Sequence, residues 1–169
     1  MVTLTLMVGI PGSGKSTEVQ KMINNNTLYV SRDEIRFSKV AENEEYFSKE
    51  NEVFDEFIRE IAARLFCGYN VIADATHITQ KSRAKTINAV KNGLKLVSGN
   101  EKYLEEMVEL QACVINKGLE TALKQNENRL GTRSYVPRSV IRRMYEQFED
   151  ISQEENFEII IRVKENENE

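Results

Sequence analysis

The stretch Gly9–Thr17 (GIPGSGKST) constrains this chain more than any other feature, because it fits the pattern G-x-x-x-x-G-K-[ST] at every fixed position. The apolar residues 3–8 precede it and are typical of a strand. Val19, Met22 and Ile23 follow it with the i, i+3, i+4 spacing of a helix. Strand, glycine loop and helix in this order predict a loop whose backbone wraps around a phosphate group.

Each residue type in this loop has a chemical use. Glycine lets the backbone approach an anion closely, and the amides of the loop and of the following helix point at the phosphates. Lys15 would reach the β- and γ-phosphates of a nucleotide, and the Ser16 hydroxyl would ligate Mg²⁺. The loop residues expected to bind nucleotide are Gly9, Pro11, Gly12, Ser13, Gly14, Lys15, Ser16 and Thr17. We therefore expect ATP, or another nucleoside triphosphate, together with Mg²⁺.

Strand-like segments alternate with helical patterns along the rest of the chain. Further strands are predicted at residues 27–30, 71–73, 110–115 and 157–163. Apolar side chains repeat with helical spacing in residues 54–65, 87–94 and 140–148. This alternation predicts an α/β fold of the P-loop NTPase or kinase type, with a parallel sheet of about five strands covered by helices on both faces. A ligand should bind at the carboxyl ends of the strands.

The domain organisation is expected to be simple. The length of 169 residues suggests one domain, which we place at residues 1–164, followed by a frayed acidic tail at 165–169. Residues 93–107 interrupt the alternation, because a Ser-Gly-Asn break is followed by a short amphipathic pattern. We interpret this segment as an insertion that packs against the sheet edge or carries a partner contact, and the sequence favours neither.

Composition excludes several classes of protein. Hydrophobic residues make up 40% of the chain and charged residues 30%, as in ordinary globular domains. The chain has no apolar run long enough for a membrane span, and its N-terminus enters the first strand without a basic region. We therefore expect no membrane association, no signal peptide and a cytoplasmic location. Cys67 and Cys113 lie beside apolar residues and are expected to be buried free thiols.

Charges are unevenly distributed, although the net charge is only −4. Residues 42–60 carry eight acidic side chains against two basic ones, whereas residues 129–143 carry five arginines and no acid. This pattern argues against a broad surface for long polyanions and favours a local anion site in the arginine stretch. A solvated helix face remains the alternative for Arg138, Arg142 and Arg143.

The segment Ser31–Arg36, just after the second predicted strand, contains candidate residues for binding the acceptor, the molecule whose hydroxyl group receives the phosphoryl group. Asp33 follows a strand that we expect beside the phosphate loop, where its carboxylate would accept the proton of a hydroxyl group. Arg36 lies one helical turn further on and would grip an anionic group of the same molecule. Ser31 and Glu34 also fit a helix capping box, which leaves Asp33 and Arg36 free for that chemistry.

Two polar residues follow the third predicted strand. Asp74 comes directly after the apolar residues 71–73, and an acid at this place in a phosphate-loop protein holds Mg²⁺ directly or through water. A plain strand-end carboxylate is the alternative. His77 is the only histidine of the chain, and we expect a loop histidine near the site in preference to a catalytic base.

Residues 125–137 join two helical patterns and suit a mobile lid over a nucleotide. The segment combines glycine and polar side chains with two arginines, Arg129 and Arg133. Arginines at such a place would neutralise charge on a phosphoryl group during its transfer. We count both among the nucleotide-binding candidates.

Together these motifs resemble the 5′-hydroxyl polynucleotide kinase domain of bacteriophage end-healing enzymes, over about residues 2–150. The resemblance rests, in chain order, on the phosphate loop, Ser31-Arg32-Asp33-x-x-Arg36, Ile72-Ala73-Asp74-Ala75-Thr76 and Asn126-x-x-Arg129…Val136-Pro137…Arg143-Met144-Tyr145. It implies that Asp33 is the general base and that Arg36 holds the acceptor's 3′-phosphate. It also implies that Lys15 and Arg129 stabilise the transferring phosphoryl group, with Ser16 toward the metal.

The resemblance implies transfer of the γ-phosphate of ATP to the 5′-hydroxyl of DNA or RNA, or to a nucleoside 3′-phosphate. Gln125 stands where the family often has another arginine, and Arg133 is the candidate to replace it. The chain has no Asp-x-Asp-Gly-Thr phosphatase motif, so we expect a stand-alone kinase. Two alternatives remain open: a P-loop kinase of a small molecule or modified base, and an NTP-binding regulatory module without transfer. Asp33 and the arginine lid argue against the second.

Overall fold

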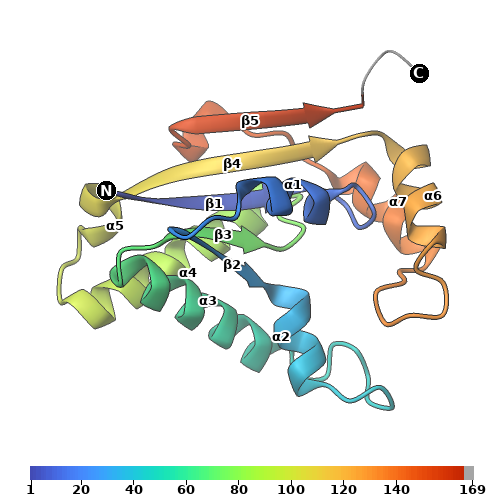
Figure 1. Cartoon of the computed structure of the whole chain (residues 1–169), viewed down its shortest axis with the longest axis horizontal. Helices are drawn as coiled ribbons and strands as arrows, with labels where there is room; N and C mark the ends of the chain where they lie inside the picture. Colours follow the sequence, from blue (N-terminus) through green and yellow to red (C-terminus); the bar gives the residue numbers. More distant parts are fainter. Residues whose placement is uncertain (166–169) are drawn as a thin grey trace.

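A computed structural model describes residues 1–165 of the chain and shows a five-stranded sheet whose neighbouring strands are all parallel (Figure 1). The strands are β1 (Val2–Val8), β2 (Thr27–Ser31), β3 (Asn70–Asp74), β4 (Val108–Asn116) and β5 (Ile159–Lys164). All five predicted strands are confirmed, with small differences at their ends. The predicted α/β fold with a parallel sheet is therefore confirmed as well.

The strand order β2-β3-β1-β4-β5 corrects one expectation. The strand beside β1 is β3 and not β2, and Asp74 of β3 is in register with Met7 on one side and Ser31 on the other. Because the carboxyl ends of parallel strands share one edge of the sheet, the phosphate loop, Asp74 and the segment after β2 all lie at that edge. Asp33 is therefore separated from the phosphate loop by β3.

Helices cover both faces of the central strands. The helices are α1 (Lys15–Met22), α2 (Arg32–Lys39), α3 (Glu50–Phe66), α4 (Gln80–Ser98), α5 (Tyr103–Met107), α6 (Leu119–Glu127) and α7 (Arg138–Gln147), with a 3₁₀ turn at Gln153–Glu155. Helices α3 and α4 pack on one face and α1 on the other. Helices α6 and α7 stand at the carboxyl ends of the strands, on the right of Figure 1.

The alternation of side chains along β1 divides the core into two layers. Leu4 and Leu6 point to one face and join a cluster with Phe57 of α3. Met7 points to the other face and packs with Val19 of α1. Since successive side chains of a strand lie on opposite faces, a strand that is buried on both sides must be apolar throughout, as β1 nearly is.

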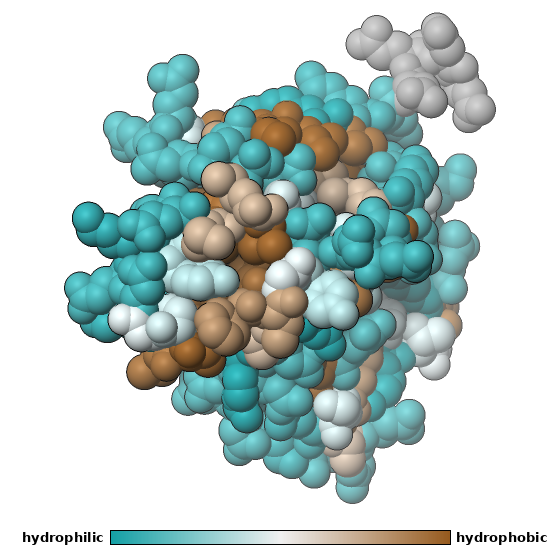
Figure 2. Space-filling model, turned by 60° about the vertical axis from the view of Figure 1, so that its left-hand side comes forward, coloured by the Kyte–Doolittle hydropathy of each residue, from teal (hydrophilic) through white to brown (hydrophobic). Residues whose placement is uncertain are grey.

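The covering of the sheet is incomplete at β5, which differs from the expected two-sided cover. Ile159, Ile160 and Ile161 are each 36–41% exposed, and β5 pairs only with β4. Other exposed apolar side chains lie at the C-terminal ends of α3, α4 and α5, as Phe66, Leu96, Val97 and Met107. Figure 2 brings this end of the molecule forward, and brown side chains gather on it, away from the carboxyl edge of the sheet.

The segment set apart at residues 93–107 consists of the last turns of α4, a turn and the short helix α5. Leu104 of α5 is buried in the same cluster as α3 and α4, so this segment helps to cover the sheet. Cys113 is a buried free thiol as expected, whereas Cys67 is exposed. Cys67 differs because it lies just past the end of α3, where the chain turns at the surface.

Of the expected acidic tail at residues 165–169, only Glu165 lies within the described part of the chain. Glu165 accepts a hydrogen bond of 2.6 Å from the Thr121 hydroxyl, and residues 166–169 lie outside the described part of the chain. Within residues 1–165, no helix has the length and apolar character needed to cross a membrane.

Candidate active site

The phosphate loop has the backbone shape that its glycines predict. Gly12 and Gly14 have φ angles of 80° and 95°, which other residues rarely adopt. A Cβ on Gly12 would also lie 2.4 Å from the carbonyl oxygen of Ala122, because α6 packs directly on the loop. The loop is therefore shaped by its own glycines and held in place by α6.

Lys15, the first residue of α1, folds back beneath the loop. Its Nζ donates to the carbonyl oxygens of Gly9 at 2.8 Å and Ile10 at 3.1 Å. These contacts hold the ammonium against the backbone of the first two residues of the loop.

The charges of four predicted site residues act on one another. Burial lowers the pKa of Lys15, while the negative charges of Asp74 and Asp33 raise it and the positive charge of Arg129 lowers it. The lid arginine and the two strand-end carboxylates thus lie close enough to the ammonium to affect its protonation. Lys15, Asp33, Asp74 and Arg129 thus lie within electrostatic range of one another, and their roles in one site stay a prediction.

Asp74 has the environment of a candidate metal ligand. Its Oδ2 accepts a hydrogen bond of 2.8 Å from the Tyr29 hydroxyl, while its buried Oδ1 has no hydrogen-bond partner among residues 1–165. Burial raises the pKa of Asp74, and the nearby Lys15 lowers it. The described residues contain no cluster of three or more acidic, histidine or cysteine ligands. Asp74 and the exposed Ser16 stay the predicted ligands of Mg²⁺, and phosphate and water oxygens would complete its shell.

Helix α2 presents the acceptor-side candidates. The Ser31 hydroxyl accepts from the Glu34 amide at 3.2 Å and caps the helix, but the reciprocal contact of a capping box is not formed. The Asp33 side chain is 64% exposed at the first turn, whereas the Arg36 side chain is 6% exposed. The predicted geometry, with both groups on one side of the helix, is confirmed by a contact of 2.5 Å between Arg36 Nη1 and Asp33 Oδ1.

The Arg36 guanidinium is fully engaged by partners that the sequence analysis missed. Glu50, at the start of α3, accepts from its Nε at 3.1 Å and from its Nη2 at 2.8 Å. The Tyr46 hydroxyl lies 3.0 Å from Arg36 Nη1 and 3.0 Å from Asp33 Oδ1. Arg32 also donates to Glu50 at 2.5 Å. Only the acid-rich composition of residues 42–60 hinted at these partners.

The expected lid is the loop between α6 and α7. Asn126 is fully buried, and its side chain donates to the Val136 carbonyl at 2.7 Å and accepts from the Val136 amide at 3.0 Å. This clasp joins the two ends of the lid. Arg133 does not lie in the cluster around Lys15: it donates to the carbonyl oxygens of Phe37 at 3.3 Å and Val40 at 2.6 Å. The lid therefore rests on the C-terminal end of α2, and a nucleotide contact for Arg133 stays a prediction.

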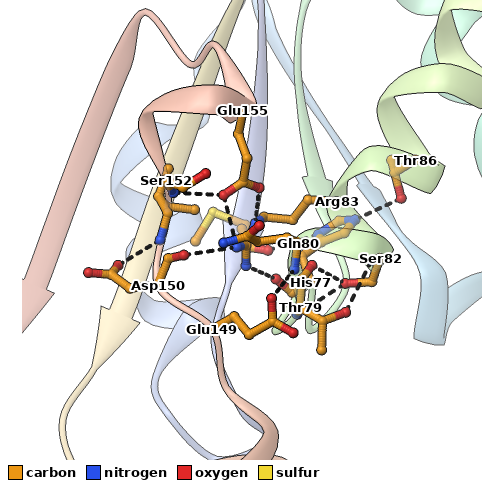
Figure 3. A network of polar contacts seen from close by, with 12 residues as sticks. His77, Thr79, Gln80, Ser82, Arg83, Thr86, Glu149, Asp150, Ser152 and Glu155 are labelled. Carbon is orange, nitrogen blue, oxygen red and sulfur yellow. Dashed lines mark hydrogen bonds and ion pairs between the residues drawn. The ribbon is translucent and has the colours of Figure 1, made fainter.

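His77 lies in a buried polar network that joins the loop after β3 to the rest of the fold (Figure 3). Its Nδ1 donates to the Met7 carbonyl at 2.9 Å, and its Nε2 lies 3.1 Å from the Thr86 hydroxyl. The fully buried Arg83 donates to the His77 carbonyl at 2.8 Å and forms an ion pair of 2.6 Å with Glu155. These contacts give His77 a structural role, in agreement with the expectation that it is not a catalytic base.

Stability is expected to fall between pH 7.5 and pH 5 because of His77. Burial lowers the pKa of His77 to about 4, from 6.5 in the unfolded chain. In this window the unfolded chain binds a proton that the folded chain does not, so acidification favours unfolding by about 2 kcal/mol at pH 5. Thermal unfolding followed by circular dichroism at both pH values measures this loss. The variant His77→Gln should show a smaller loss, and an equal loss in both proteins would contradict the assignment.

Lys117, in the loop after β4, is a candidate that the sequence analysis missed. Its Nζ lies 3.4 Å from the place that a Cβ on Gly14 would occupy, and the Gln125 Oε1 lies 3.9 Å from the same place. The buried Ser13 hydroxyl, which has no hydrogen-bond partner among residues 1–165, lines the same small cavity as Lys117. A lysine in an ordinary loop gives no sequence signal, because only the fold brings it to the phosphate loop.

Solved structures similar to this chain include kinases of different substrates. A chain of the Pnkp1/Rnl/Hen1 RNA repair complex has a TM-score of 0.69 and 24% identity, over 86% of this chain and 43% of that one. A sugar kinase from Janibacter sp. HTCC2649 has a TM-score of 0.63 and 13% identity, over 97% of this chain and 86% of that one. A fungal RNA kinase has a TM-score of 0.60 and 14% identity, over 99% of this chain and 77% of that one.

At these identities, the likeness shows the fold, and this chain spans less than half the length of the RNA repair protein. No curated protein sequence matches the chain. The AAA domain family matches residues 4–151, which include the phosphate loop, Asp33, Asp74 and the lid. The chain belongs to the AAA domain family and has the fold of a P-loop kinase.

Proposed function

We propose that this protein transfers the γ-phosphate of ATP to the 5′-hydroxyl of a DNA or RNA end. The observation that carries the proposal is the pairing of Asp33 with Arg36 at the carboxyl edge of the sheet, the edge at which the phosphate loop also lies. A site that only senses nucleotide needs no carboxylate on the acceptor side, whereas a hydroxyl acceptor needs a group to take its proton. Two of the similar structures, an RNA repair complex and a fungal RNA kinase, support the same acceptor class.

In the proposed reaction each residue has one task. Lys15 and the loop amides bind the phosphates of ATP, and Arg129 approaches from the lid to neutralise charge on the transferring group. Asp33 orients the acceptor hydroxyl and accepts its proton as the new oxygen–phosphorus bond forms and the bond from the γ-phosphorus to the bridging oxygen of ATP breaks, which releases ADP. Asp74 and Ser16 hold Mg²⁺, which supplies further charge neutralisation when bound. Arg36 holds the phosphate on the 3′ side of the acceptor nucleoside.

A small-molecule kinase is the second candidate, and one observation favours it. Glu50 neutralises Arg36 in this structure, so a neutral acceptor such as a sugar or nucleoside would meet no unpaired arginine. A sugar kinase is among the similar structures. Transfer of radiolabelled phosphate from ATP to 5′-hydroxyl oligonucleotides, nucleosides and sugars, tested in parallel, distinguishes the two candidates. Labelling of sugars alone would overturn the polynucleotide proposal.

The variant Arg36→Ala is expected to lose the preference for acceptors that carry a 3′-phosphate. The wild-type protein should use a nucleoside 3′-monophosphate much better than the bare nucleoside. A charge-assisted contact is worth about 1.5–3 kcal/mol, so kcat/KM for the monophosphate should fall roughly ten- to a hundredfold in the variant. The KM for ATP should stay the same, because Arg36 lies on the acceptor side.

The matched control for this measurement is Arg59→Ala, which removes an exposed arginine from α3. It should leave both acceptors unchanged. Suppose that the wild-type protein has the same kcat/KM for the bare nucleoside and for the monophosphate, and that Arg36→Ala changes neither value. Arg36 then binds no acceptor phosphate, and the small-molecule candidate takes precedence.

A further inference from the structure

Two side chains from one short stretch, residues 46–50, contact both of the residues that we propose bind the acceptor, Asp33 and Arg36. Tyr46 places a hydroxyl on Asp33, and Glu50 places a carboxylate on Arg36. The acceptor in the proposed reaction offers the same two groups, a hydroxyl to be phosphorylated and a phosphate on its 3′ side. In this stretch the Tyr46 hydroxyl thus corresponds to the hydroxyl of an acceptor, and the Glu50 carboxylate corresponds to its phosphate.

Tyr46 is bound as a hydroxyl donor would be. Its oxygen lies 3.0 Å from Asp33 Oδ1, and its pKa is raised to about 12 by burial and by the charge of Asp33, so it keeps its proton. A protonated phenol can donate to the carboxylate, as an acceptor hydroxyl must before its proton is transferred. The Arg36 guanidinium lies over the Tyr46 ring at 4.6 Å, which fixes the ring beside both residues.

Glu50 is bound as an anion would be. Both of its oxygens accept from Arg36 Nη2, at 2.8 and 2.9 Å, and Oε2 also accepts from Nε at 3.1 Å. This paired contact is the geometry by which arginine holds carboxylates and phosphates. With Asp33 and Tyr46 on Nη1, each nitrogen of Arg36 has a protein partner. A phosphate can reach this guanidinium only if Glu50 gives way.

We propose that Tyr46 and Glu50 form an internal plug that imitates the acceptor and that the acceptor must displace before transfer. The inference rests on the proposed function and adds a selection rule to it. A molecule that brings only a hydroxyl can displace Tyr46 but leaves Glu50 on Arg36. A molecule that brings both a hydroxyl and a neighbouring phosphate replaces both contacts, so the plug favours nucleotide ends over sugars.

The surroundings of the plug allow such a displacement without unpacking of the core. Residues 41–48 are all exposed and form no helix or strand. Tyr46 is 38% and the neighbouring Phe47 61% exposed, and the Tyr46 ring contacts those of Phe47 and Phe37 at the surface. Glu50 is the first residue of α3, and the N-cap residue Lys49 makes no side-chain hydrogen bond to the first turn of that helix, although its Nζ donates to the Lys39 carbonyl at 2.8 Å. Local opening that breaks the contacts of Tyr46 with Asp33 and of Glu50 with Arg36 and Arg32 therefore frees Asp33 and Arg36 while the core stays packed.

If the plug exists, two variants should change the KM values of two acceptors in different ways. Glu50→Gln keeps the shape of the side chain but removes the charge that competes for Arg36, so the KM of adenosine 3′-monophosphate should fall about three- to tenfold while the KM of adenosine stays nearly unchanged. Tyr46→Phe keeps the ring but removes the hydroxyl from Asp33, so the KM should fall about twofold or more for both acceptors. In each variant kcat and the KM for ATP should stay near wild type.

Calorimetric titration with adenosine 3′-monophosphate, without ATP, gives a second measurement that does not depend on turnover. Binding to Glu50→Gln should be tighter than binding to wild type by the same factor as the change in KM. The control Glu52→Gln removes one charge from an exposed site on the same helix and should bind as wild type does. Thermal unfolding confirms that each variant is folded.

The possible results separate the plug from the proposed function. If wild type phosphorylates the monophosphate but Glu50→Gln binds it equally or more weakly, Glu50 only positions Arg36, and the plug is overturned while the function stands. A loss of folding in Glu50→Gln, with no gain in Tyr46→Phe, likewise overturns the plug and leaves the function standing. If neither wild type nor any variant phosphorylates the monophosphate or a 5′-hydroxyl oligonucleotide, both proposals fail.

Discussion

Replacing Lys15 by alanine is expected to reduce phosphoryl transfer to below a few per cent of the wild-type rate. The Lys15 ammonium is held against the backbone of the phosphate loop, and the charges of Asp74, Asp33 and Arg129 act on it. No other cation comes from the loop itself, so alanine removes the group that would meet the β- and γ-phosphates. The measurement is transfer of radiolabelled γ-phosphate to a 5′-hydroxyl oligonucleotide at saturating ATP.

The fold should survive this substitution, which makes the loss of activity interpretable. The loop keeps its shape through Gly12 and Gly14 and through its contact with Ala122 of α6, none of which involve the lysine side chain. Lys21→Ala is the matched control, because Lys21 lies on the same helix and its side chain is 65% exposed. Activity of Lys15→Ala comparable to that of Lys21→Ala would show that the loop has no role in transfer.

Much of the fold could be predicted because the signals are local. Each strand is an apolar run that ends at polar or glycine residues, and strand β1 is followed at once by a motif whose glycines leave few backbone conformations. The positive φ angles at Gly12 and Gly14 are the backbone conformations that the glycines of the motif predict. Helices α3 and α4 could be predicted from apolar side chains at helical spacing, which lie in the core.

The order of the strands could not be predicted in the same way. Whether β2 or β3 lies beside β1 depends on which crossover helices pack on which face, and this is decided by contacts between residues far apart in the chain. The same limit explains the exposed isoleucines of β5. An apolar run predicts a strand, but it does not say whether the strand lies at an edge or under a helix.

The residues of the candidate site likewise fall into those with a local sequence signal and those that only the folded chain brings together. Asp33, Asp74 and Lys15 follow strand ends, so one rule about parallel sheets places all three. The partners of Arg36 come from a different helix and a loop, and no spacing in the sequence links Glu50 to Arg36. For Arg133 the sequence indicates a partner that the structure does not show. An arginine in a polar loop suggests a phosphate partner, but in the folded chain Arg133 donates to two carbonyl oxygens at the end of α2.

Replacing Asp33 by asparagine is expected to lower kcat by about 10²–10⁴-fold, the usual effect of losing a general base. Asparagine has nearly the same shape and keeps an oxygen for Arg36 and Tyr46, but it cannot take the proton of the acceptor. Because the Asp33 side chain is 64% exposed, the melting temperature should change little. Asp55→Asn, an exposed carboxylate on α3, is the control and should keep full activity.

Affinity for ATP distinguishes this role of Asp33 from a role in the nucleotide site. Asp33 lies beyond β3 from the phosphate loop, so its replacement should leave the dissociation constant for ATP within about twofold of wild type in a calorimetric titration. If Asp33 is the general base, raising the pH should not restore the kcat of Asp33→Asn, because the variant lacks the carboxylate that accepts the proton. If ATP binding falls together with kcat, Asp33 acts on the nucleotide or its metal, and the proton of the acceptor must leave by another group.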